Sequence, residues 1–209
     1  MLNKQLLDNG FLLVKNMVSV DIADGLYREL VDRGQTKLHF LDNEFHGPCY
    51  NYQSPTASQE LLFYLLHDMV DIVGESLFPT YSYMRLYKHN AFLNPHTDRP
   101  ACEVSLTVHL GSDKEWEFGI RNYRNNNEFN VVLEQGDALV YLGCVAPHWR
   151  NGKYTGENFA QCFLHYVRSR GRFAYCINDI DRSKPDGMWE DSLKLKYDSW
   201  IGVTKHNQN

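Results

Sequence analysis

The segment NPHTDRP, residues 94–100, places a histidine and an aspartate two positions apart, with a proline on either side of the pair. On an extended backbone alternate side chains point to the same face, so His96 and Asp98 can reach a single ion. An isolated H-x-D also occurs in solvated surface turns, where the aspartate bonds to nearby backbone. The pair therefore indicates a metal site only if a third ligand arrives from elsewhere in the chain.

Three downstream histidines are candidates for that ligand: His109, His148 and His165. His148 is distinguished by its setting, because EQGDALVYLGCVAPHW (134–149) contains a turn, an apolar strand, a glycine and then Pro-His-Trp. About 50 residues separate it from the first pair, enough for several strands to return the chain to one barrel mouth. His109 and His165 lie inside strand patterns, and we interpret them as wall or core histidines. His148 is the predicted third ligand.

Two imidazoles and a carboxylate on one side of a metal form the facial triad of non-haem Fe(II) oxygenases, which leaves positions open for dioxygen and a co-substrate. Hydrolytic zinc sites also combine two histidines with a carboxylate, so the ligands alone do not choose the metal. Metal binding and catalysis are both predicted to depend on these residues: His96, Asp98 and His148.

The elements that would position these ligands are short runs of β-branched and aromatic residues after Pro79, without intervening helices. This pattern of short β-rich runs predicts an antiparallel sandwich or small barrel over about residues 79–176. The expected strands are TYSYMRLYKH, EVSLTVHLG, WEFGIRNY, EFNVVLE, DALVYLG and NFAQCFLHYVR.

The N-terminal part, about residues 1–78, is expected to support the barrel. GFLLVKNMV (10–18) is typical of a strand, and Ser19 can cap a helix over about residues 20–34. Residues 58–77 predict a second helix that is apolar on most faces and therefore well covered.

Two irregular segments rich in polar and aromatic residues, 37–57 and 121–129, suit loops over the barrel mouth. The last part, about residues 177–209, is expected to be a C-terminal extension with a helical segment at DSLKLKYDSWIG.

Composition favours one ordinary domain over residues 1–209, because a chain of 24.4 kDa can bury a real core. The formal charge of −5 does not favour binding to nucleic acid or to an anionic membrane. Small molecules or proteins are therefore the expected substrates. The five cysteines are odd in number and widely spaced, so we expect reduced thiols. Without a membrane span or secretion signal, a cytoplasmic protein is expected.

These motifs together resemble the 2-oxoglutarate/Fe(II)-dependent dioxygenase superfamily, whose members range from prolyl-hydroxylase-like to Jumonji-like. The matching residues are His96, Asp98 and His148, and the segment before PHW is typical of the family. The resemblance covers most of the chain and implies a mainly β fold with flanking helices (α+β). That fold is a double-stranded β-helix, the jelly-roll or cupin-like barrel, with N-terminal helices packed on it. The implied cofactor is Fe(II), with 2-oxoglutarate and O2 as co-substrates.

The remote carboxylate of 2-oxoglutarate requires a fixed cation to orient it. In prolyl-hydroxylase-like relatives this is an Arg or Lys within G-x-[RK] after the distal histidine, but residues 156–158 here read GEN. The Jumonji-like arrangement nominates Lys114. The alternatives are Arg150, two residues beyond the distal histidine, and Arg85, on the strand that leads to the site. Tyr87 could offer its phenol to the co-substrate.

Further residues are expected around the site as substrate contacts or supporting neighbours: Arg85, Tyr83, Trp149 and Gln161.

The resemblance implies an oxygenase that converts 2-oxoglutarate to succinate and CO2 and hydroxylates a C–H bond of an amino acid, a peptidyl side chain or a small metabolite. Two other interpretations stay open. A cupin-like metal-dependent hydrolase or isomerase would use the same triad without an oxoacid, and a non-catalytic β-barrel binding module would retain the ligands without turnover.

Overall fold

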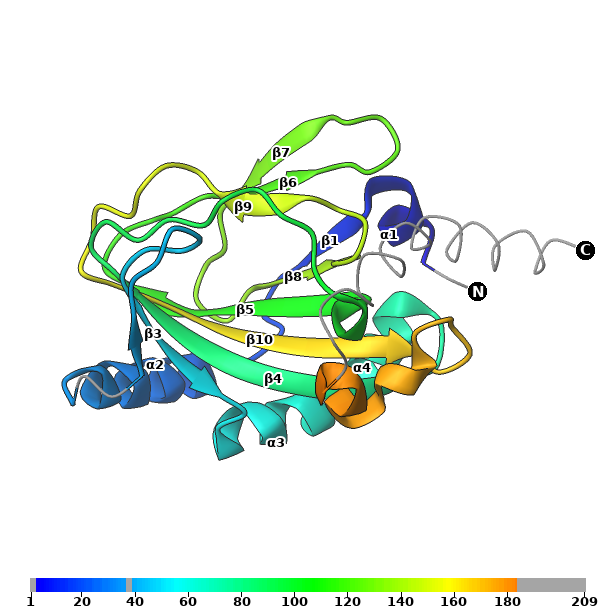
Figure 1. Cartoon of the computed structure of the whole chain (residues 1–209), viewed down its shortest axis with the longest axis horizontal. Helices are drawn as coiled ribbons and strands as arrows, with labels where there is room; N and C mark the ends of the chain where they lie inside the picture. The colour runs from blue at the N-terminus through cyan, green and yellow to red at the C-terminus, as the bar shows by residue number, and fades with distance from the viewer. Residues whose placement is uncertain (1–2, 37–38, 184–209) are drawn as a thin grey trace, which may run out of the picture.

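The computed structural model describes residues 3–36 and 39–183. Its architecture is mixed α+β, with a large antiparallel sheet, a small antiparallel sheet lying over one face of it, and helices against the other face (Figure 1). The predicted helical segment DSLKLKYDSWIG, residues 191–202, lies outside the described residues.

The large sheet joins the first strand of the chain to the strands of the barrel. Its order is β1-β8-β5-β10-β4-β3-β2, with every pair antiparallel. In that order the strands are Phe11–Val14, Ala138–Tyr141, Val104–Ser112, Asn158–Arg168, Leu77–Lys88, Cys49–Gln53 and Phe40–Leu41.

The small sheet consists of β7 (Glu128–Val131), β6 (Phe118–Arg121) and β9 (His148–Arg150), in that order. An isolated antiparallel bridge joins His96 to His148, so the H-x-D segment lies along the free edge of β9. The two facing sheets confirm the predicted mainly β fold with flanking helices.

Strand register decides which side chains point between the sheets. On β4 and β10, Tyr83 is opposite Phe163 and Arg85 is opposite Gln161. Because side chains alternate along a strand, these residues share the face toward the small sheet, while Met84 belongs to the core on the helix side.

The helices of the N-terminal half are α1 (Lys4–Asn9), α2 (Val20–Gly34), α3 (Thr56–Tyr64) and α4 (Leu66–Val73). Ser19 caps α2 by accepting a hydrogen bond from the Ile22 N–H at 3.3 Å, which confirms the predicted start of that helix.

The prediction of one helix over residues 58–77 was wrong. The backbone leaves helical geometry at Leu65 (φ −83°, ψ 0°), between α3 and α4, and Leu77 already belongs to β4. Segment 37–57 was likewise expected to be loop, but it contributes β2 and β3 to the edge of the large sheet. Two short 3₁₀ segments complete the described chain: η1 (Pro100–Cys102) and η2 (Ala174–Ser183).

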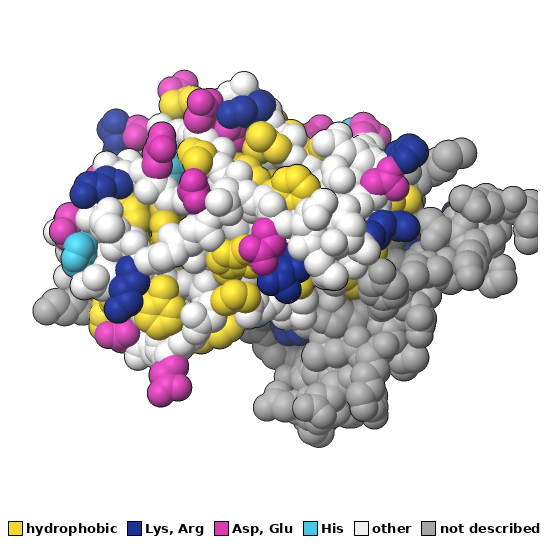
Figure 2. Space-filling view, turned by 90° about the horizontal axis from the view of Figure 1, so that it is seen from above, with side chains coloured by type: hydrophobic (Ala, Val, Ile, Leu, Met, Phe, Trp, Pro, Cys, Tyr) yellow, Lys and Arg dark blue, Asp and Glu magenta, His cyan; other side chains and the backbone are white. Residues whose placement is uncertain are grey.

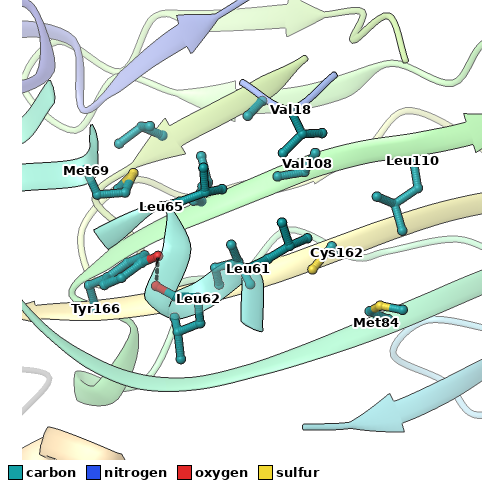
Figure 3. Close-up of a cluster of buried hydrophobic side chains, with 14 of the residues drawn as sticks. Val18, Leu61, Leu62, Leu65, Met69, Met84, Val108, Leu110, Cys162 and Tyr166 are labelled. Carbon is teal, nitrogen blue, oxygen red and sulfur yellow. Dashed lines mark hydrogen bonds between the residues drawn. The ribbon is translucent and has the colours of Figure 1, made fainter. Parts of the chain in front are cut away.

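The main core lies between the helices and the large sheet (Figure 3). Leu61, Leu65 and Met69 from α3, α4 and their junction belong to the same buried cluster as Val108 of β5. One polar contact joins the layers, because the Tyr166 hydroxyl donates a 2.8 Å hydrogen bond to the Leu62 carbonyl. The helices thus cover the face of the large sheet that is opposite to the small sheet.

The surface mixes charges of both signs, as the face in Figure 2 shows. Among the described residues, no helix has the length and apolar character needed to cross a membrane. All five cysteines are buried and none forms a disulfide, in agreement with the predicted reduced thiols.

Candidate metal centre

The structure brings His96, Asp98 and His148 together. Oδ1 of Asp98 lies 3.8 Å from Nε2 of His96 and 3.6 Å from Nε2 of His148. Metal–nitrogen and metal–oxygen bonds are about 2.0–2.2 Å long, so donors at this spacing can share one ion. The three donor atoms lie within 4.8 Å of one another.

Backbone carbonyls fix the tautomer of both imidazoles. Nδ1 of His96 lies 2.8 Å from the Asn94 carbonyl, and Nδ1 of His148 lies 3.0 Å from the Ala146 carbonyl. A carbonyl oxygen only accepts, so each Nδ1 carries the proton and each Nε2 offers a lone pair toward Asp98. Such orientation by a neighbouring acceptor is what metal-ligating histidines require.

The backbone of the H-x-D segment is tied to its neighbours at each ligand. The His96 N–H donates to the His148 carbonyl at 3.1 Å, and the reverse bond measures 2.9 Å. The Asp98 N–H donates to the Gly143 carbonyl at 2.8 Å. The triad is therefore held by sheet-type bonding rather than by side-chain contacts alone.

Asp98 is an anion in this environment. Burial by itself would raise the pKa of its carboxyl, but the imidazoles of His148, His165 and His96 lower it, and so does a 3.2 Å hydrogen bond from the Ser105 hydroxyl. The net effect is a pKa below the usual value. An ionised carboxylate beside two imidazole lone pairs suits a divalent cation.

A cavity of about 250 Å³ opens on the triad. Its walls are largely aromatic, with two arginines and a cysteine among them. Besides the triad they comprise Phe45, Tyr81, Tyr83, Arg85, Tyr87, Leu93, Thr97, Arg99, Cys102, Phe118, Tyr141 and Phe163.

Arg150 is buried behind this cavity, and the described residues offer it no anion. Its guanidinium carbon lies 5.1 Å from the Phe118 ring centre and 4.5 Å from that of Phe159. One nitrogen donates to the Trp116 carbonyl at 2.6 Å, but Nε and Nη2 have no hydrogen-bond partner among the described residues. Burial lowers the pKa of Arg150 to about 10. A buried cation without an acidic partner among the described residues thus lies against Phe118 in the cavity wall.

Two further polar side chains lie on the inner face of the large sheet without partners. Thr107 is opposite Phe163, and Gln161 is opposite both Arg85 and His109. The Thr107 hydroxyl and both ends of the Gln161 amide are buried and unpaired among the described residues. Buried polar atoms are almost always hydrogen-bonded in proteins, so these groups indicate space for a polar ligand.

Arg85 and Tyr87 lie in the wall of the cavity. Arg85 donates to the Tyr87 hydroxyl and the Asn51 amide oxygen, both at 3.2 Å, so its partners are neutral. Burial would lower the pKa of this arginine, but the phenols of Tyr87 and Tyr83 beside it raise the value overall. Arg85 is thus the second cation available to an acidic ligand.

Other predicted residues lie elsewhere. Lys114 is exposed, and its Nζ donates to the Thr155 carbonyl at 3.2 Å, so the structure does not bring it to the cavity. Trp149 alternates with the inward His148 and Arg150 on β9, and its indole N–H donates to Asn151 at 2.6 Å. The structure therefore assigns Trp149 to the outer face of the small sheet.

Ser105, Thr107 and Tyr141 were not singled out from the sequence. A signal for two of them was present, because polar residues occupy alternate positions in VSLTVHL, an otherwise apolar run. On a strand that alternation means a polar stripe on one face, which here faces the site. Tyr141 carries no comparable signal, since it ends an apolar run.

No protein-family model and no curated protein matches the sequence. Solved structures do match in fold. A prolyl-4-hydroxylase from Pseudomonas putida superposes with a TM-score of 0.64 at 17% identity, covering 78% of this chain and 95% of that one. HygX from Streptomyces hygroscopicus, with nickel and 2-oxoglutarate bound, has a TM-score of 0.63 at 12% identity, with coverages of 82% and 89%. The fold is that of the 2-oxoglutarate/Fe(II) oxygenases.

A third match to this oxygenase fold is SnoN from nogalamycin biosynthesis, described as a non-haem α-ketoglutarate-dependent epimerase. Its TM-score is 0.65 at 12% identity, covering 78% of this chain and 80% of that one. The shared feature is therefore the double-stranded β-helix, while the reactions named for its members differ.

Proposed function

We propose that this chain is an Fe(II)- and 2-oxoglutarate-dependent oxygenase whose metal is held by His96, Asp98 and His148. The observation that carries the proposal is the convergence of two oriented imidazole lone pairs and an ionised carboxylate beside a cavity. This donor set occupies one side of an ion and leaves the other side to ligands from the cavity. The chain's fold relatives include HygX with iron bound, which supports the choice of metal.

Bound iron and 2-oxoglutarate would together supply the oxidising power, with O2 consumed and succinate and CO2 released. The contribution of the chain is to hold, orient and seclude these groups. The Asp98 carboxylate and the Nε2 atoms of His96 and His148 would all bind the metal from one side. The backbone hydrogen bonds at each of these residues hold the three side chains in that arrangement.

The remote carboxylate of 2-oxoglutarate is assigned to Arg150. Its two unpaired N–H groups are buried, and a carboxylate would satisfy both the hydrogen bonds and the charge. Thr107 and Gln161 provide further unpaired polar atoms on the opposing sheet. Arg85 is the alternative, because it lines the cavity itself, and Tyr87 beside it can donate a phenol to the co-substrate.

The substrate enters the same cavity. A space of about 250 Å³ that must also hold part of the co-substrate admits only a small metabolite or one side chain of a peptide. Tyr83 and Phe163 stack at 4.4 Å between ring centres along its wall and exclude water from the reacting groups. Tyr83 and Arg85 are thus the residues proposed to contact the substrate. The proposed enzyme is cytoplasmic and hydroxylates a C–H bond of an amino acid, a peptidyl side chain or a small metabolite.

The test is turnover by anaerobically reconstituted protein. Iron, 2-oxoglutarate and O2 are added with panels of amino acids, peptides and metabolites, and succinate is measured together with product masses. A product heavier by one oxygen atom supports hydroxylation. Succinate release with a product of unchanged mass, or of a mass lower by two hydrogen atoms, would show that the enzyme catalyses a different reaction, such as epimerisation or desaturation. Absence of succinate with every panel, in protein that binds iron, would reject the oxygenase in favour of a hydrolase, an isomerase or a binding module.

A further inference from the structure

A second group of potential metal ligands shares Asp98 with the triad. One potential donor atom each from Asp98, Cys102 and His165 lies within 4.8 Å of the others. Cys102 ends η1 and His165 lies on β10, so separate elements meet at this point. Both side chains are buried, with 2% of their surface exposed in each case.

The two carboxylate oxygens of Asp98 have different neighbours. Its Oδ1 is the atom nearest to the imidazoles of His96 and His148, whereas Oδ2 accepts the hydrogen bond from Ser105. Ser105 also contacts His165, through a 2.9 Å hydrogen bond between Oγ and Nδ1. One carboxylate is thus presented to both groups at once.

The hydrogen bonds of Ser105 fix the tautomer of His165. The Asp98 carboxylate and the Cys102 carbonyl, each 3.2 Å from Oγ, can only accept, so they compete for the single hydroxyl proton. Toward His165 the hydroxyl oxygen must therefore accept, and Nδ1 of His165 carries the proton. Nε2 is left as a lone pair.

That lone pair has no hydrogen-bond partner among the described residues. The ring packs against Tyr81, with 4.5 Å between ring centres, and the Tyr81 hydroxyl lies 3.1 Å from the Cys102 sulfur. One nitrogen of the His165 ring, the Cys102 sulfur and an Asp98 carboxylate oxygen therefore lie within 4.8 Å of one another in a buried spot. A buried lone pair without a donor is rare and points to a missing ligand.

We propose that Asp98, Cys102 and His165 form a second metal site, adjacent to the triad, that takes a thiophilic divalent ion such as Zn²⁺ with Asp98 as the bridging ligand. Sulfur and imidazole donors select zinc over magnesium or calcium, which prefer oxygen alone. Binding releases the Cys102 thiol proton to solvent, and the tyrosine hydroxyl stays as a hydrogen-bond donor to the ligated sulfur.

Cobalt(II) is the probe for this site, because a cobalt–thiolate bond gives an intense near-ultraviolet charge-transfer absorption that imidazole and carboxylate ligands do not. Anaerobic titration of the full chain with Co²⁺ should show two equivalents bound and the thiolate band. Cys102→Ser keeps the size of the side chain and should remove the band and weaken one equivalent at least tenfold. His165→Gln should weaken the same equivalent.

Two control variants separate this site from the rest of the protein. Cys162→Ser changes another buried cysteine, in the core on the helix side, and should retain the band. His148→Ala should lose the Co²⁺ ion bound by the triad but keep the cobalt–thiolate band. This result does not depend on whether the protein is an oxygenase. The second site is refuted if wild-type protein gives no thiolate band, if Cys102→Ser retains it, or if His148→Ala abolishes it in folded protein.

Discussion

Gly143 and Asp98 are packed so closely that no side chain fits between them. The Gly143 carbonyl accepts the Asp98 backbone N–H at 2.8 Å, and a Cβ atom built on Gly143 would overlap Oδ2 of Asp98. The glycine lies in the turn after β8, some way along the chain from the H-x-D segment. The missing side chain of Gly143 thus makes room for the carboxylate of Asp98, the proposed metal ligand.

Gly143→Ala should therefore impair metal binding although it replaces none of the three triad residues. The methyl group displaces either the Asp98 carboxylate or the Cys102 carbonyl, which is equally close. We expect Mn²⁺ affinity, measured by calorimetry, to fall at least tenfold. Gly25→Ala is the matched control, because an added Cβ there meets nothing within 4 Å. Equal metal affinities of the two variants would show that Asp98 tolerates the displacement.

Arg150→Met should separate co-substrate binding from stability. Methionine removes a buried cation that has no anionic partner among the described residues, and replacing such a charge by an apolar side chain is often neutral or stabilising. The melting temperature without ligand should stay equal or rise. The increase that 2-oxoglutarate produces in the presence of Mn²⁺ should disappear, since only a ligand held by the folded state stabilises it.

Arg85→Gln and Lys114→Ala complete that experiment. Lys114→Ala should leave 2-oxoglutarate binding unchanged, because its ammonium group contacts the Thr155 carbonyl at the surface. A loss of binding of about 100-fold in Arg150→Met, worth roughly 3 kcal/mol, fits a charge-assisted pair. If Arg85→Gln shows that loss and Arg150→Met does not, the anchor is Arg85.

His109 should make the protein sensitive to mild acid. Burial, together with the nearby Arg150, lowers the pKa of this imidazole to about 4. A histidine with a depressed folded pKa contributes stability that is present above its unfolded value of about 6.5 and is lost as pH falls toward 4. His109→Gln should flatten urea-unfolding free energies over that window, by on the order of 2 kcal/mol.

His165 has the same depressed pKa of about 4 and contributes to the same window, so a residual slope is expected in His109→Gln. His67→Gln is the control, because His67 is an exposed residue of α4 with Nε2 3.8 Å from the Asp71 carboxylate. An unchanged slope in His109→Gln would mean that its imidazole is solvated in the folded protein.

Glu103 and Arg168 form a fully buried ion pair beside η1, with Nη2–Oε1 and Nε–Oε1 distances of 2.8 and 2.9 Å. Arg168→Met should cost about 3–5 kcal/mol in urea unfolding, because it leaves the Glu103 carboxylate buried without its cation, with, among the described residues, only the backbone N–H of residue 168 still donating to it. The double variant with Glu103→Gln should recover much of that loss. Additive losses instead would show that the two side chains do not act as a pair.

The short β-rich runs after Pro79 were sufficient to predict the strands of the barrel and the mainly β fold, but not β2 and β3. The polar residues at every second position of β5, and the alternation of Tyr81, Tyr83, Arg85 and Tyr87 on one face of β4, follow directly from the period of a strand. The break between α3 and α4 was not predictable in this way, because residues 58–77 are apolar on most faces and contain no proline or glycine before Gly74. A continuous apolar pattern does not reveal where the backbone turns.

Residue types and spacing predicted the candidate metal triad: an H-x-D pair between prolines and a histidine after an apolar strand selected two of the nine histidines as ligands. Only the tertiary structure distinguished the candidate cationic partners. The sequence nominated Lys114 first, with Arg150 and Arg85 as alternatives, whereas strand register and burial separate an unpaired buried guanidinium from an exposed lysine. The same holds for Cys102 and His165, because the closeness of two residues far apart in sequence depends on how the strands pair, which no local pattern encodes.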